Sequence, residues 1–139
     1  MNEQAKDLKI RTKAFALRVI RMYSKLPGNN AVAQVPGRQV LRSGTAVGAN
    51  YREASRTRSQ AEFISKTGDC LKEIDEAEYW LELIVDSGCI PAGRMAELLD
   101  EARATHRNIC DHRQKSQRPK CRLQHLAFRI RPLLSTSFA

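Results

Sequence analysis

The clearest candidates for metal chemistry are two pairs of cysteine and histidine near the C-terminal end of the chain. They are Cys110-x-His112 and Cys121-x-x-x-His125, and His106 precedes Cys110 by one helical turn. Structural zinc sites use paired cysteines and paired histidines at short spacings, which neither pair reproduces. We therefore expect no metal site, and no motif in the chain predicts another cofactor.

Catalytic motifs are also missing from the sequence. The chain contains no glycine-rich phosphate loop, no His-Glu-x-x-His pair and no nucleophile elbow. Its carboxylates gather in one acidic segment, residues 59–102, and no isolated pair suited to acid–base catalysis stands out. We therefore expect a protein that is not an enzyme.

Basic side chains are the remaining candidates for chemistry. The candidate nucleic-acid-binding residues are Arg11, Arg18, Arg21 and Lys25 on one helical face, and Arg52, Arg56 and Arg58 further along. The first 58 residues hold 12 lysines and arginines but only three acids, so local ion pairs cannot neutralise them. Arginine binds phosphate through its planar fork, and each neutralised phosphate releases counterions.

The residues next to these cations in the sequence indicate the type of nucleic-acid binding. No aromatic residues are interleaved with them, so base stacking and sequence recognition are not indicated. The pattern favours non-specific or shape-based binding of RNA or DNA. The alternative is a charged face that is simply solvated.

Charge alternates along the chain, which has a formal net charge of +9. Residues 1–58 carry +9, residues 59–102 carry −8 and residues 103–139 carry +8. An acidic helical face of one copy could therefore dock on a basic face of another. The acids on that face are Asp69, Glu73, Asp75, Glu76, Glu78 and Glu82. A homo-oligomeric protein–protein scaffold without a nucleic-acid role is thus the alternative function.

Four helical segments must position these side chains. We predict helices over about 4–26, 36–56, 59–87 and 92–116 within one domain, residues 1–118, followed by a basic, loosely ordered tail, 119–139. Pro36 disfavours helix at the residue before it, so the second helix is placed from Pro36 onward. Ser59 and Glu62 have the spacing of a capping box. The fold class is all-α, an antiparallel up-down-up-down four-helix bundle.

The second helix combines an inward apolar stripe with an unusually high number of small residues. Its stripe is Val40, Gly44, Val47, Tyr51 and Ala54, and comparable stripes run through the other three segments. A glycine inside a helix costs about 1 kcal/mol relative to alanine. Gly44 and Gly48 therefore indicate that another backbone passes close to this helix.

Residues 39–54, together with the Tyr-Trp-Leu-Glu-Leu run at 79–83, resemble a known family. The matching motifs are Leu26-Pro27, Gln39-x-x-Arg42-Ser43, Ala49-Asn50, Arg52-Glu53-Ala54, Phe63-Ile64 and Lys72-Glu73. Over residues 10–115 the chain resembles the four-helix bundle proteins first noted in intervening sequences of bacterial large-subunit ribosomal RNA genes. Accessory variability determinants of diversity-generating retroelements share that fold. Much of the family has an acidic-glycine pair where this chain has Glu53-Ala54, as one subgroup does.

The resemblance implies a homopentameric ring of short bundles around a central opening, with no enzymatic activity. It also implies a function for related proteins: accessory variability determinants are thought to hold a reverse transcriptase and template RNA through a positively charged surface. A reverse transcriptase is therefore one possible partner.

The polar side chains of the second helix have two interpretations. Arg42, Asn50 and Glu53 fall on roughly one side of it, and Glu73 is a candidate partner for Arg42. They could contact a ligand or RNA. We favour a structural polar network that fixes how helices align, because half-buried polar groups between helices need hydrogen-bond partners.

Cellular location is inferred from cysteine usage and hydropathy. The four cysteines are too widely spread for a small disulfide framework. No apolar run has the length of a signal peptide or a membrane span. We therefore expect a cytoplasmic protein without membrane association.

Overall fold

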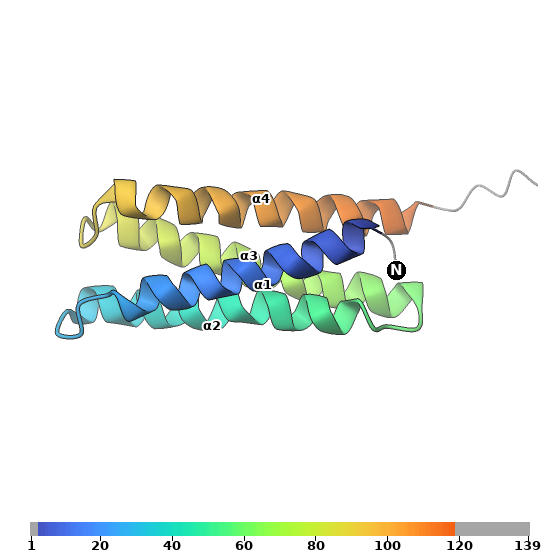
Figure 1. Cartoon of the computed structure of the whole chain (residues 1–139), viewed down its shortest axis with the longest axis horizontal. Coiled ribbons are helices and arrows are strands. Elements are labelled where there is room, and N and C mark those ends of the chain that lie inside the picture. The colour runs from blue at the N-terminus through green and yellow to red at the C-terminus, as the bar shows by residue number, and fades with distance from the viewer. Residues whose placement is uncertain (1–2, 119–139) are drawn as a thin grey trace, which may run out of the picture.

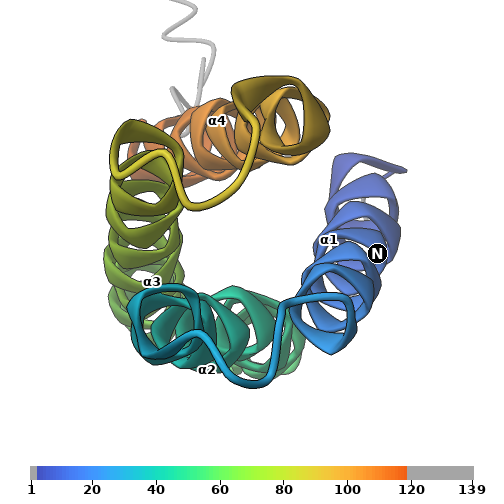
Figure 2. The same cartoon turned by 90° about the vertical axis from the view of Figure 1, so that its left-hand side faces the viewer.

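Four long helices make up residues 3–118, the part of the chain that the computed structural model describes (Figure 1). They are α1 (Glu3–Ser24), α2 (Ala31–Ala54), α3 (Gln60–Asp86) and α4 (Ala92–Gln117). Each helix packs against the next, and α4 returns to α1 with the smallest of the four contacts (Figure 2). The predicted all-α up-down bundle is confirmed. The predicted tail, 119–139, lies outside the described residues.

The predicted start of the second helix was wrong by five residues. We placed it at Pro36, but α2 begins at Ala31 and contains Pro36. Asn30 caps the helix, because its Oδ1 accepts hydrogen bonds from the backbone N–H groups of Val32 (3.1 Å) and Ala33 (3.3 Å). Such a cap satisfies two of the N–H groups that a helix leaves free at its start.

Tertiary contacts hold this first part of α2 despite the hydrogen bond that Pro36 cannot donate. The Gln34 side-chain amide donates to the Pro27 carbonyl oxygen at 3.0 Å. The Tyr23 hydroxyl donates to the Gln34 side-chain oxygen at 3.1 Å. Ala33 is fully buried, so the extra turn also contributes to the core.

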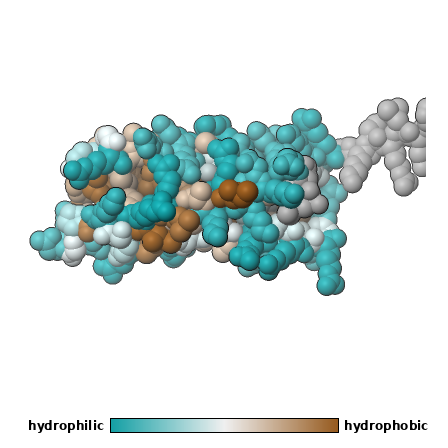
Figure 3. All heavy atoms as spheres, viewed as in Figure 1, coloured by the Kyte–Doolittle hydropathy of each residue, from teal (hydrophilic) through white to brown (hydrophobic). Residues whose placement is uncertain are grey.

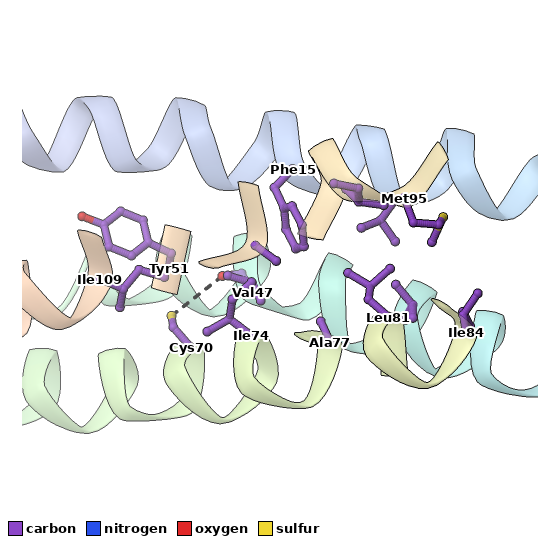
Figure 4. Close-up of a cluster of buried hydrophobic side chains, with 14 of the residues drawn as sticks. Phe15, Val47, Tyr51, Cys70, Ile74, Ala77, Leu81, Ile84, Met95 and Ile109 are labelled. Atoms are coloured by element: carbon purple, nitrogen blue, oxygen red, sulfur yellow. Dashed lines mark hydrogen bonds between the residues drawn. The ribbon is translucent and has the colours of Figure 1, made fainter. Parts of the chain in front are cut away.

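The core follows the predicted stripes. Buried positions include Leu8, Phe15 and Val19 on α1; Val40, Val47, Tyr51 and Ala54 on α2; Cys70, Ile74, Ala77, Leu81 and Ile84 on α3; and Met95, Leu98, Ala102 and Ile109 on α4 (Figure 4). The thiol of Cys70 donates to the Val47 carbonyl oxygen at 3.8 Å. Burial raises the pKa of Cys70 to about 12, so it is a small, unreactive core residue.

Close packing of α1 on α2 explains the two helical glycines. A Cβ at position 44 would lie 2.9 Å from Cγ2 of Val19, which is itself fully buried. A Cβ at position 48 would lie 3.3 Å from the backbone oxygen of Thr12. The predicted close approach of another backbone is therefore confirmed at Gly48, whereas Gly44 makes room for the Val19 side chain.

Thr105 leads to the first testable prediction. Within residues 3–118, its Oγ1 is a buried side-chain atom without a hydrogen-bond partner. Replacing Thr105 with valine removes this unsatisfied hydroxyl at nearly constant shape, and should raise the free energy of unfolding by about 1 kcal/mol. Urea denaturation would measure the change.

The control for that measurement is Thr67→Val. The Thr67 hydroxyl is also buried but donates to the Phe63 carbonyl oxygen at 2.8 Å, so its removal loses a hydrogen bond. Thr67→Val should leave stability unchanged or lower it. Equal destabilisation by both replacements would contradict the unsatisfied state of Thr105.

Candidate nucleic-acid interface

The predicted basic residues lie toward two ends of the bundle and do not form one patch. Arg52, Arg56 and Arg58 lie where α2 ends and α3 begins, whereas Arg21 and Lys25 lie at the opposite end, where α1 finishes (Figure 1). The 24 residues of α2 alone span about 36 Å. The two groups are therefore too far apart to contact the same short stretch of nucleic acid. Arg11 lies between them on α1.

Arg52, Arg56 and Arg58, here called the arginine cluster, are exposed and free of ion pairs within the described part of the chain. The neighbouring acids do not pair with these guanidinium groups. Glu53 pairs with Lys66 at 2.7 Å, and the Glu62 carboxylate accepts a hydrogen bond from the backbone N–H of Arg58 at 3.2 Å. The cluster thus presents three unneutralised guanidinium groups.

A short, hydrogen-bonded connection positions the arginine cluster. Ser59 caps α3, and its Oγ accepts from the backbone N–H of Glu62 at 3.1 Å, which confirms the Ser59 half of the predicted capping box. The Glu62 carboxylate binds the backbone N–H of Arg58 in place of that of Ser59. Two hydroxyls donate to carbonyl oxygens at the end of α2: Ser55 to Arg52 at 2.7 Å, and Thr57 to Ala54 at 2.8 Å. These local bonds fix the backbone between the two helices.

Arg18 differs from the other predicted cations because it forms ion pairs with another helix of the same chain. Its guanidinium bridges α1 to α4, where it contacts Glu101 and lies 3.4 Å from Glu97. Its charge is therefore largely compensated. Arg11, Arg21 and Lys25 form no ion pair within residues 3–118.

Arg42 does meet Glu73, as predicted. The Arg42 guanidinium lies 3.4 Å from Glu73 and also binds Glu76, which sequence reasoning missed although it follows Glu73 at helical spacing. The indole N–H of Trp80 donates to the same Glu76 carboxylate at 3.2 Å. These hydrogen bonds, that from Arg42 above all, lower the pKa of Glu76. This contact links α2 to α3.

The predicted four-residue polar network is otherwise wrong. Glu53 pairs with Lys66 and not with Arg42 or Asn50. Among the described residues, no hydrogen bond or ion pair joins the Asn50 side chain to another group. Eight residues of helix separate Arg42 from Asn50, about 12 Å, which is too far for one connected set of side chains.

Comparison with known proteins decides the family. The family model described as 23S rRNA-intervening sequence protein matches residues 6–110. The chain belongs to the 23S rRNA-intervening sequence protein family. No curated protein matches the chain.

A solved structure supports the same family assignment. It is the crystal structure of a protein of unknown function, from the S23 ribosomal protein family, of Bacteroides thetaiotaomicron. The two chains are 32% identical, and the match covers 80% of this chain and 98% of the other with a TM-score of 0.74. Within the described residues of this family member, no helix is both long and apolar enough to cross a membrane.

The candidate metal pair Cys110-x-His112 is separated by the fold of this family member. His112 turns into the core, where its Nδ1 lies 3.0 Å from the Tyr51 hydroxyl and its ring packs edge-on against Phe63. His106 instead lies 2.9 Å from a Glu78 carboxylate oxygen. Between residues 3 and 118, no three Cys, His, Asp or Glu side chains are grouped to hold a metal. Cys121 and His125 lie outside the described residues.

The buried His112 gives a pH prediction. Burial lowers the pKa of His112, so the folded protein holds this proton less tightly than the unfolded chain does. Above a pH of about 6.5, the ordinary pKa of histidine in an unfolded chain, His112 is neutral in both states and the fold keeps its full stability. As the pH falls below that value, the unfolded chain binds a proton that the folded protein disfavours, so the free energy of unfolding decreases. Urea denaturation between pH 7.5 and pH 5 should show declining stability. His112→Gln should flatten that decline, and an unchanged pH dependence in this variant would contradict the assignment.

Proposed function

We propose that this family member is a non-enzymatic, oligomeric accessory protein that binds RNA or DNA through the arginine cluster. One observation carries the proposal: three exposed arginines lie within seven residues, and none of their guanidinium groups forms an ion pair in the described region. Glu53 pairs with Lys66, and Glu62 accepts from the backbone N–H of Arg58 and not from a guanidinium group. A concentrated, uncompensated set supports phosphate binding.

The chemistry of the cluster supports recognition of backbone and shape. Guanidinium groups bind phosphate oxygens in a bidentate manner and read no base identity from them. No Phe, Tyr or Trp lies in the connection 55–59, so the cluster has no platform on which a base could stack. Structured RNA of many sequences is therefore the expected ligand.

We also propose that the protein assembles with itself as a homopentamer, as the family resemblance implies. Exposed apolar side chains on α3 support self-association: Tyr79 is 55% and Leu83 is 38% exposed, beside the half-buried Trp80. Acidic side chains surround them and complement the basic parts of a second copy. The likeness to accessory variability determinants makes a reverse transcriptase a candidate protein partner.

The same α3 surface favours a second function, an oligomeric scaffold that binds another protein and no nucleic acid. Tyr79 and Trp80 pack edge-on with ring centroids 5.2 Å apart, forming an aromatic patch of the kind that anchors protein interfaces. In that case the arginine cluster would be a solvated surface.

Fluorescence anisotropy with a labelled RNA stem-loop separates the two functions. The accessory role predicts binding at 50 mM salt that weakens at least tenfold at 200 mM, because phosphate contacts release counterions. Absence of binding at 50 mM salt would overturn it in favour of the scaffold. Light scattering should give five times the mass of one chain, and a monomer would contradict the proposed assembly.

A further inference from the structure

A cleft of about 580 Å³ opens between the end of α1 and the start of α4. Its floor is apolar, formed by the core residues Ile90, Met95 and Leu98 with the half-buried Met22 and Leu26. Figure 2 views this end of the bundle, where α1 stands apart from α4. In Figure 3 hydrophobic atoms reach the surface toward the same left-hand end, with hydrophilic ones lying across them.

Cations line the rim of this cleft. Arg21, Lys25 and Arg94 all line it, are exposed, and have no ion pair within residues 3–118. Arg18 is the fourth basic lining residue, and it contacts Glu101. Among the described residues that line the cleft none is acidic, so its rim carries a net positive charge.

The start of α4 adds to this positive potential. Its N-cap is Pro91, which makes no side-chain capping bond, and the first turn contains no acidic residue. The N–H groups and the dipole at a helix start attract anions when nothing caps them. Pro91 and Arg94 line the cleft, so the start of α4 lies beside the cations.

We propose that the cleft binds a small organic anion with an apolar body. The apolar floor would bury the body of the ligand, and Arg21, Lys25 and Arg94 would bind its charged head. A volume of about 580 Å³ lies within the range of small-molecule sites. Nucleic-acid phosphates alone would leave the apolar floor uncovered. This site is separate from the arginine cluster, which lies at the other end of the bundle.

Calorimetry with three probes tests the proposal: decanoate, decanol and acetate. Decanoate should bind at least tenfold more tightly than decanol, which lacks the charge, and acetate, which lacks the apolar body, should not bind measurably. Arg94→Gln combined with Lys25→Gln should weaken decanoate binding at least tenfold. Arg103→Gln on the same helix is the control, since Arg103 pairs with Glu82 outside the cleft.

Cysteine alkylation locates the bound probe. Cys89 lines the cleft and Cys110 does not, and both are half-buried free thiols. Decanoate should slow alkylation of Cys89, measured by peptide mass spectrometry, and leave Cys110 unaffected. Equal affinity for decanol, unaltered alkylation of Cys89, or a change in molar mass on adding decanoate would overturn the proposal. The last result would mean that a second copy of the chain occupies the cleft.

Discussion

Replacing Gly44 with leucine is expected to lower the free energy of unfolding by about 3 kcal/mol or more. A Cβ at this position already lies 2.9 Å from Cγ2 of Val19, and Leu adds three more carbons in that direction. Val19 is fully buried, and because a β-branched side chain strongly prefers one χ1 rotamer in a helix, it moves aside only at a cost in free energy. Helices α1 and α2 must then move apart. Thermal and urea denaturation would measure the loss.

The matched control uses alanine at two helical glycines. Gly44→Ala should destabilise by about 1 kcal/mol, since the clash with Val19 outweighs the better helix propensity of alanine. Gly68→Ala should stabilise by up to about 1 kcal/mol, because its Cβ would meet only the Arg113 side chain, at an ordinary 3.8 Å. Stabilisation by both replacements would show that α1 and α2 are not closely packed at Gly44.

Reversing the charge of the arginine cluster should reduce RNA affinity about 100-fold. In the triple variant Arg52, Arg56 and Arg58 become glutamate. Three charge-assisted phosphate contacts at about 1 kcal/mol each correspond to roughly that factor. All three side chains are exposed, so the fold should be retained, as circular dichroism would verify. Fluorescence anisotropy with the RNA stem-loop measures the affinity.

A second triple variant, with the same change in net charge at other places on the surface, tests whether the location of the arginines matters. It replaces Lys13, Arg38 and Arg107 with glutamate; all three are exposed and form no ion pair within the described chain. Its affinity should fall less than tenfold, since only the general field changes. Equal losses in both variants would argue against a localised site. Loss of the oligomer in the cluster variant would assign those arginines to assembly.

Local periodicity made the bundle predictable. The stripe Val40, Gly44, Val47, Tyr51 and Ala54 is buried as predicted, since helical spacing alone decides which residues share a face. The start of α2 was not predictable in the same way. It depends on the Asn30 cap and on Gln34, which binds both Tyr23 and Pro27, and these contacts outweigh the effect of Pro36.

Contacts between helices limited how much of the candidate site could be predicted from the sequence. Arg42 and Glu73 could be paired from their helical faces, but Lys66 as the partner of Glu53 depends on how α3 is rotated against α2. The Tyr51–His112 hydrogen bond joins residues 61 positions apart, and no local pattern indicates it. In the sequence His112 stands out only as a neighbour of Cys110, and nothing near it points to Tyr51 as its partner.

The distribution of the cations follows from topology. Sequence alone grouped Arg21 and Lys25 with the arginine cluster because all are basic and lie in the first 58 residues. Because α1 and α2 run in opposite directions, they lie at opposite ends of the bundle (Figure 1). The two groups of predicted cations thus lie apart, one as the arginine cluster and the other on the rim of an apolar cleft.

The salt dependence of RNA binding tests the arginine cluster most directly. Log affinity against log salt concentration, measured from 50 to 200 mM for the wild-type chain and the cluster variant, counts the phosphates contacted. Three phosphate contacts to the double-stranded stem predict a wild-type slope of about −3 or steeper, and a slope shallower by about 3 in the variant. Equal slopes for the two proteins, or a wild-type slope near zero, would contradict phosphate binding by Arg52, Arg56 and Arg58.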